Sequence, residues 1–118
     1  MRLREALRRG VRVGLGSDVA AGRTFDMRRI AASAYDTALA LGEPLSPEEV
    51  FTLATWGGAD ALGFGDRTGA LTPGRRADLA VLDVPAHARS LPDVLGHALF
   101  ESDATRVVHT YVAGRATL

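Results

Sequence analysis

One short strand pattern in the first 66 residues constrains the fold more than any other feature of the sequence. Residues 11–15, VRVGL, are rich in β-branched side chains, which favour an extended strand. A parallel strand needs a neighbouring strand to pair with, and the first 66 residues offer no second strand pattern. We therefore expect this chain to be the end of a larger fold, and not a self-sufficient domain.

Helix patterns surround this strand. Residues 2–9 carry apolar side chains at helical spacing, and residues 26–41 repeat them every three or four positions, with Asp26 placed as an N-cap. Ser46 and Glu49 form a capping-box pattern with Pro47 at the first helical position, which predicts a third helix. We expect the glycine pair 57–58 to interrupt this helix before a further turn over residues 59–62.

The second part of the chain is dominated by strand and turn patterns, not by helix patterns. Strand formers occupy residues 77–83 and 106–112, a short helix pattern covers residues 93–100, and Ala113-Gly114 predicts a turn that returns residues 115–118 as a hairpin partner. The chain therefore divides into residues 1–66, dominated by helix, and residues 67–118, dominated by strand and turn.

Composition narrows the functional classes. Fourteen basic and fourteen acidic residues give a net charge of +0, which argues against capture of nucleic acid or of an anionic membrane. No stretch is apolar enough to span a bilayer and no signal core opens the chain, so we expect a cytoplasmic protein. Cysteine is absent, which excludes disulfides and thiolate metal sites. The three histidines, His87, His97 and His109, stand too far apart to form a local metal-binding pair.

Asp18 is the first candidate for chemistry, because it directly follows the strand pattern in a Gly-Ser-Asp turn. Side chains just beyond the carboxyl end of a barrel strand point into the active-site mouth. The alternative is that Asp18 only caps a turn or the next helix. A second acidic residue, Asp78, lies at a strand entry next to Arg75 and Arg76, and we interpret it as structural.

Three ordered motifs add up to a family resemblance. They are GLGSD at residues 14–18, LATWGGADALG at residues 53–63, and TGALTPGRRADLAVLD at residues 68–83. Together they resemble the C-terminal end of an amidohydrolase-superfamily enzyme. Within the superfamily the chain is most similar to the guanine deaminase family, through residues 18–35 and the ending TYVAGR at residues 110–115.

This resemblance implies a fold and a reaction. The fold is a (β/α)₈ TIM barrel with a small accessory β-sandwich, in which residues 1–66 supply the last βα unit and closing helices and residues 67–118 the C-terminal sandwich strands. The reaction is the zinc-dependent hydrolysis of guanine, a small purine, to xanthine and ammonia. Asp18 matches the aspartate that approaches the metal, so it is expected to be both a metal ligand and a catalytic proton acceptor.

The resemblance also leaves expectations and alternatives. The family's metal-binding histidines have no counterpart in this chain, so we expect the chain to be inactive alone. We also expect the full-length protein to be a homodimer. Two other interpretations stay open. The chain can belong to another deaminase or chlorohydrolase of the superfamily, or it can be a non-catalytic remnant that serves as a structural module.

Overall fold

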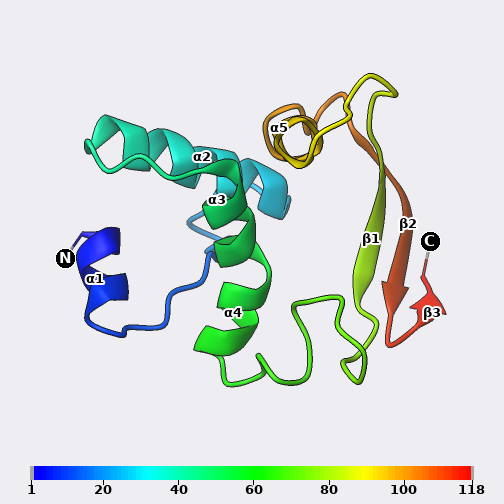
Figure 1. The fold of residues 1–118 in the computed structure, drawn as a ribbon, viewed down its shortest axis with the longest axis horizontal. Helices are drawn as coiled ribbons and strands as arrows, with labels where there is room; N and C mark the ends of the chain where they lie inside the picture. The colour runs from blue at the N-terminus through cyan, green and yellow to red at the C-terminus, as the bar shows by residue number, and fades with distance from the viewer. Residues whose placement is uncertain (1, 118) are drawn as a thin grey trace.

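The computed structural model describes residues 2–117, and Figure 1 shows helices on one side of the molecule and strands on the other. In chain order the elements are α1 (Leu3–Arg8), α2 (Met27–Ala40), α3 (Pro47–Ala54), α4 (Trp56–Ala61), β1 (Leu79–Asp83), α5 (Leu91–Phe100), β2 (Arg106–Val112) and β3 (Arg115–Ala116). The mixed α/β content expected from the sequence is confirmed. Within residues 2–117, no helix is both long and apolar enough to cross a bilayer.

The local signals that start helices are confirmed. The Asp26 carboxylate accepts a hydrogen bond of 2.9 Å from the amide of Arg28 and caps α2. The Ser46 hydroxyl accepts from the amide of Glu49, and the Glu49 carboxylate accepts from the amide of Ser46, so α3 opens with both halves of a capping box. These bonds satisfy amides that a helix cannot pair internally, which is why the pattern fixes the helix start.

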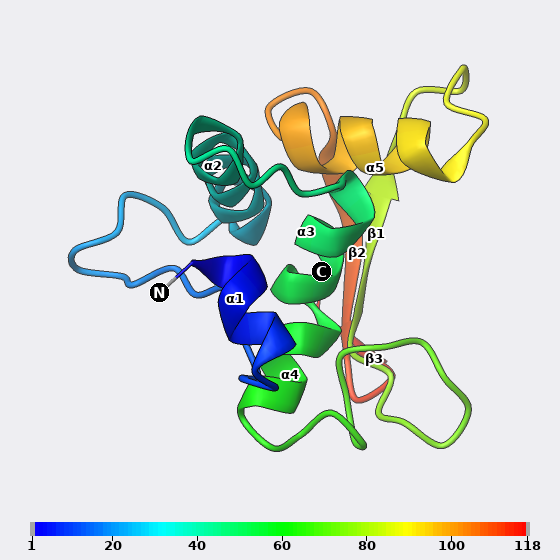
Figure 2. The same cartoon turned by 60° about the vertical axis from the view of Figure 1, so that its left-hand side comes forward.

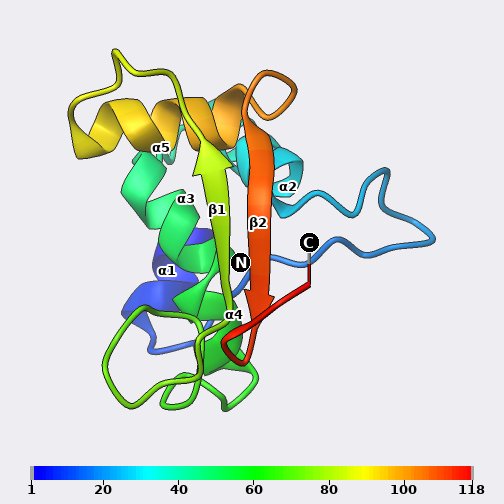
Figure 3. The ribbon, with the colours of Figure 1, turned by 90° about the vertical axis from the view of Figure 1, so that its right-hand side faces the viewer.

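The core of the molecule forms where three helices meet. It joins side chains of α2, α3 and α5 with one residue of the α2–α3 connection: Ala31, Ala38, Leu45, Val50, Leu53, Leu95 and Leu99. Helix α5 lies in the second half of the sequence but packs against α2 and α3 of the first half (Figure 3). The division of the chain at residue 66 stays a prediction, and this packing ties its two parts together.

The strand expected over residues 11–15 is not formed. These residues have no strand partner in the described chain and are joined to α3 by a single backbone bond, 3.0 Å long, from the Leu15 amide to the Leu53 carbonyl. A strand exists only through its ladder of bonds to a neighbour, so a β-branched sequence without that neighbour stays an extended segment. The eighth barrel strand, and with it the TIM barrel, therefore remains an expectation from the resemblance.

The break between the third and fourth helices also differs from expectation. Helix α3 ends at Ala54, and Thr55 leaves helical geometry with φ −120° and ψ −97°. Gly57 and Gly58, expected to interrupt the helix, lie inside α4. The kink therefore precedes the glycines, and the reason for two adjacent glycines in a helix must be sought in what packs against them.

The sheet is a three-stranded antiparallel meander in the order β1–β2–β3. Leu79 pairs with Tyr111 at one end and Asp83 with Arg106 at the other, and a bulge falls between Val81 and Leu82. The expected strands and the final hairpin are confirmed through residue 116, and residue 118 lies outside the described residues. No residue of these three strands is fully buried, and the half-buried ones are Leu79, Leu82, Thr110 and Tyr111.

Candidate functional site

Asp18 lies in the long connection between α1 and α2, which projects away from the helices (Figure 2). Its side chain is exposed and its backbone has φ +47°, a left-handed conformation that aspartate tolerates better than most residues. The Asp18 carbonyl accepts hydrogen bonds from the amides of Ala21 and Gly22, so the turn is closed by the backbone. The carboxylate itself caps no helix, because the N-cap of α2 is Asp26.

The same turn contains a strained residue. Ala20 has φ +97°, a region that glycine enters freely and alanine rarely does. Val19 and Gly22 form an isolated backbone bridge that holds the turn in this shape. Backbone strain persists only where the surroundings enforce it, and it gathers at functional sites. The turn that carries Asp18 is thus a tightly specified structure at the molecular surface.

Helix α1 is held to the start of α3 by an ion pair that sequence patterns did not indicate. The Arg4 guanidinium donates to both carboxylate oxygens of Glu49, at 2.8 and 3.1 Å, and to the Pro44 carbonyl at 2.7 Å. The bond from Arg4, with that from the Ser46 amide, holds the pKa of Glu49 below its ordinary value. Glu49 thereby joins α1 to the capped end of α3, and α1 leads directly into the segment that carries Asp18.

The histidines do not gather around Asp18. The His97 Nδ1 atom lies 2.6 Å from a carboxylate oxygen of Glu101, and its ring meets the ring of His87 edge-on at 5.0 Å. His109 lies on β2 and packs near Tyr111. Among the residues that the structure describes, no three His, Cys, Asp or Glu side chains come together as a metal site. The donor set present in residues 2–117 therefore does not fit a complete zinc site, and the role of Asp18 as a metal ligand stays a prediction.

Asp78 has the structural role that was expected, with more partners than its neighbours suggested. Its carboxylate accepts from Arg76 at 2.6 Å, from the Thr68 hydroxyl at 2.8 Å and from the Ala113 amide at 2.8 Å. These bonds, that from Arg76 foremost, lower the pKa of Asp78 to about 2. Asp78 ties the loop before β1 to the β2–β3 turn, and the Ala113 bond spans 35 residues, which no local pattern could reveal.

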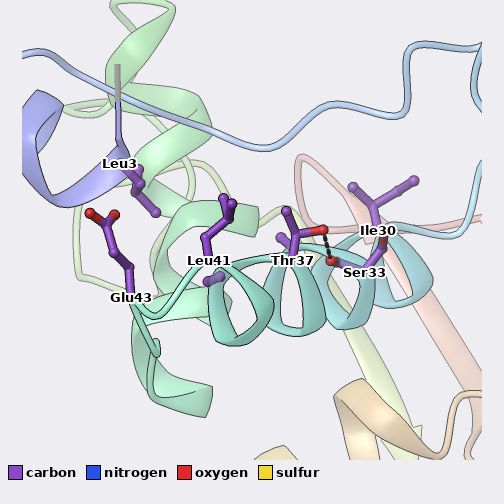
Figure 4. A pocket seen from close by; sticks show the side chains of 8 residues that line it. Leu3, Ile30, Ser33, Thr37, Leu41 and Glu43 are labelled. Atoms are coloured by element: carbon purple, nitrogen blue, oxygen red, sulfur yellow. Dashed lines mark hydrogen bonds between the residues drawn. The ribbon is translucent and has the colours of Figure 1, made fainter.

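Two hollows in the surface lie apart from Asp18. The first, about 330 Å³, is an apolar groove between α1 and α2, lined by Leu3, Ile30, Ser33, Thr37, Leu41 and Glu43 among others (Figure 4). The second, about 480 Å³, is more polar and is lined by the loop before β1, at Phe64, Asp66, Arg67, Thr68, Gly74 and Arg76. Neither hollow is lined by Asp18, so neither is the site of the expected chemistry.

Comparison with known proteins places this geometry in a family. The amidohydrolase family matches residues 1–117. A guanine deaminase of Escherichia coli is 37% identical over 122 residues, a match that covers 96% of this chain and 28% of that protein. A probable guanine deaminase of Deinococcus radiodurans is 38% identical, over 95% of this chain and 26% of the relative. The chain thus spans about a quarter of the length of these curated relatives.

Solved structures agree with the sequence relatives. The structure of E. coli guanine deaminase superimposes with a TM-score of 0.90 at 36% identity, and covers 99% of this chain and 29% of that one. An adenosine deaminase from Xanthomonas campestris, solved with bound zinc, gives a TM-score of 0.79 at 30% identity over 95% of this chain. The family match spans residues 1–117, and the backbone superimposes on that of E. coli guanine deaminase over 99% of this chain. This chain belongs to the amidohydrolase family.

Proposed function

We propose that the chain is the C-terminal part of a guanine-deaminase-like amidohydrolase, which hydrolyses guanine to xanthine and ammonia. The observation that carries this proposal is the superposition on E. coli guanine deaminase, with a TM-score of 0.90 and 36% identity over 99% of the chain.

Asp18 is the residue of this chain to which we assign chemistry. Deamination of guanine needs a base that takes a proton from the attacking water and an acid that gives a proton to the departing amine. An exposed carboxylate can do both in turn, because it holds the first proton and can return it to the leaving nitrogen as ammonia forms. The left-handed backbone at Asp18 directs this group from a closed turn and not from a flexible loop.

A catalytic zinc site needs more ligands than residues 2–117 bring together. A zinc ion, when bound, supplies the acidity that makes a water molecule nucleophilic at neutral pH. Zinc in catalytic sites takes three protein ligands, and residues 2–117 bring no three candidate donors together. We therefore propose that Asp18 contributes one carboxylate to a site whose other ligands lie outside this chain, and that the chain alone has no deaminase activity.

Two assays test this function. In the first, the purified 118-residue chain is incubated with zinc and guanine, and ammonia release is followed; we expect none, and turnover would overturn the proposal of an incomplete site. In the second, this chain replaces the matched stretch of E. coli guanine deaminase, which the two backbones' similarity permits. The chimera should deaminate guanine.

The chimera also separates the competing interpretations. Because an adenosine deaminase shares this fold, adenosine is assayed beside guanine. A chimera that folds and acts on guanine supports the proposal. A chimera that folds, by circular dichroism and a cooperative melt, but releases no ammonia from guanine would contradict it and favour a structural module.

A further inference from the structure

The segment that leads to Asp18 touches α4 backbone to backbone. A Cβ atom added at Gly14 would lie 2.4 Å from the Cα atom of Gly58 and 2.9 Å from its nitrogen. Both neighbours are main-chain atoms, so no side chain can move aside to make room. To reach the 3.4 Å at which ordinary contact begins, the segment and the helix would have to separate by about 1 Å in a close-packed region.

The contact with the segment before Asp18 also explains one of the two glycines in α4. A Cβ atom at Gly57 would lie 3.0 Å from the carbonyl oxygens of both Val13 and Thr52, whereas one at Gly58 would meet only the Leu53 carbonyl at 3.8 Å. The contact therefore needs glycine strictly at position 14, less strictly at 57 and not at all at 58. One residue further on, the Leu15 amide bonds to the Leu53 carbonyl and fixes the segment on the α3–α4 junction.

A second close approach closes the turn beyond Asp18. A Cβ atom at Gly22 would lie 1.8 Å from the Ser17 carbonyl oxygen and 2.9 Å from that of Asp18. The turn can fold back on itself only while position 22 carries no side chain. Gly16, between the two contacts, is different, because a Cβ atom there would meet nothing within 4 Å.

From these contacts we infer that Gly14 and Gly22 are positioning residues for the Asp18 carboxylate, one holding its turn on the α3–α4 junction and the other holding the turn closed. The inference rests on the proposed function of Asp18. A displacement of about 1 Å at a reacting group can cost about 10²-fold in rate. Gly14→Ala should therefore lower kcat by about 10²-fold while KM for guanine stays within a factor of about two, because the clash displaces the proton acceptor at Asp18.

The experiment compares three alanine substitutions whose added Cβ atoms come progressively less close to their neighbours. Gly14→Ala, Gly57→Ala and Gly58→Ala are placed in the chimera, and kcat and KM for guanine are measured at a temperature where circular dichroism shows each variant folded. The loss of kcat should fall in the order 14, 57, 58, with Gly58→Ala at the level of the unsubstituted chimera. Equal values of kcat in all three would overturn the inference, as would losses confined to KM.

A readout without activity, measured on the chimera, keeps the inference testable apart from catalysis. Gly14→Ala and Gly22→Ala should move the NMR amide shifts of Asp18 and its turn, and Gly14→Ala should speed hydrogen exchange of the Leu15 amide. Gly16→Ala, the matched control, should leave Leu15 protected. Exchange at Leu15 that is the same in Gly14→Ala and Gly16→Ala would refute the anchoring, whatever the activity. Loss of activity at Gly14 with an innocuous Asp18→Asn would instead refute the role of Asp18.

Discussion

Replacing Thr105 by valine tests how the two parts of the chain are joined. Thr105 is 1% exposed, and its hydroxyl donates to the His97 carbonyl at 3.0 Å. Its own carbonyl accepts from the Arg28 guanidinium at 2.6 Å, so α2, α5 and the start of β2 meet at this residue. Valine keeps the shape of the side chain but cannot donate, so the substitution removes one buried hydrogen bond.

The magnitude follows from what the carbonyl loses. A net intramolecular hydrogen bond contributes about 1 kcal/mol, and a buried group left without any partner costs up to about 3 kcal/mol. The His97 carbonyl keeps its bond from the Glu101 amide, 3.2 Å long, so the lower value applies. Thr105→Val should destabilise this junction by about 1 kcal/mol, which is about fivefold in the opening equilibrium.

Amide hydrogen exchange of the chimera with E. coli guanine deaminase, followed by NMR, measures this change at residue 105, whose amide bonds to the Glu101 carbonyl. Thr37→Val is the matched control, because the Thr37 hydroxyl makes the same kind of bond to the Ser33 carbonyl, at 2.8 Å, on an exposed helix face. Water replaces that donor, so the control should change exchange less than about twofold. Equal effects at the two sites would refute the argument that burial sets the cost.

Two further predictions concern the turn at Asp18 and the bonds to Asp78. Ala20→Gly should relieve backbone strain at φ +97° and stabilise the turn by about 1 kcal/mol, seen as about fivefold slower exchange of the Gly22 amide; unchanged or faster exchange would show that no strain is stored there. The pKa of Asp78 is lowered to about 2 from 3.8, so its stabilisation is present above pH 3.8 and is lost as the pH falls toward 2. The NMR shift of the Ala113 amide should therefore titrate near 2, and a midpoint near 3.8, or the same titration in Asp78→Asn, would contradict this.

Sequence patterns predicted the elements whose cause is local. The capping box of α3 and the Asp26 cap lie within three residues of the amides that they satisfy, so spacing alone identified those helix starts. The prediction of a strand over residues 11–15 was wrong because a strand needs a paired neighbour. A run of β-branched residues does not indicate whether that neighbour is present. The break between α3 and α4 shows the same limit, since the glycine pair predicted it at residues 57–58 and it falls at Thr55.

The site divides in the same way. The Gly-Ser-Asp turn and the family resemblance singled out Asp18, but its left-handed backbone and the two glycine contacts around it arise from atoms brought together by folding. Arg28 bonds to a carbonyl 77 residues away, and Arg4 to a carboxylate 45 residues away. Contacts between residues so far apart in the sequence depend on how the chain folds. The periodicity and spacing of residues in one sequence do not predict them.

We propose that Asp18 is the catalytic carboxylate which this chain supplies to a guanine-deaminase-like site. The direct test is kcat for guanine in the chimera with E. coli guanine deaminase, with and without Asp18→Asn, together with the melting temperature of both proteins. Asparagine keeps the size of the side chain and also tolerates a left-handed backbone, so the melting temperature should stay the same. The loss of the proton acceptor should lower kcat by about 10²–10⁴-fold. A kcat that stays within a few-fold of the unsubstituted chimera would show that Asp18 only shapes its turn and is not the catalytic carboxylate.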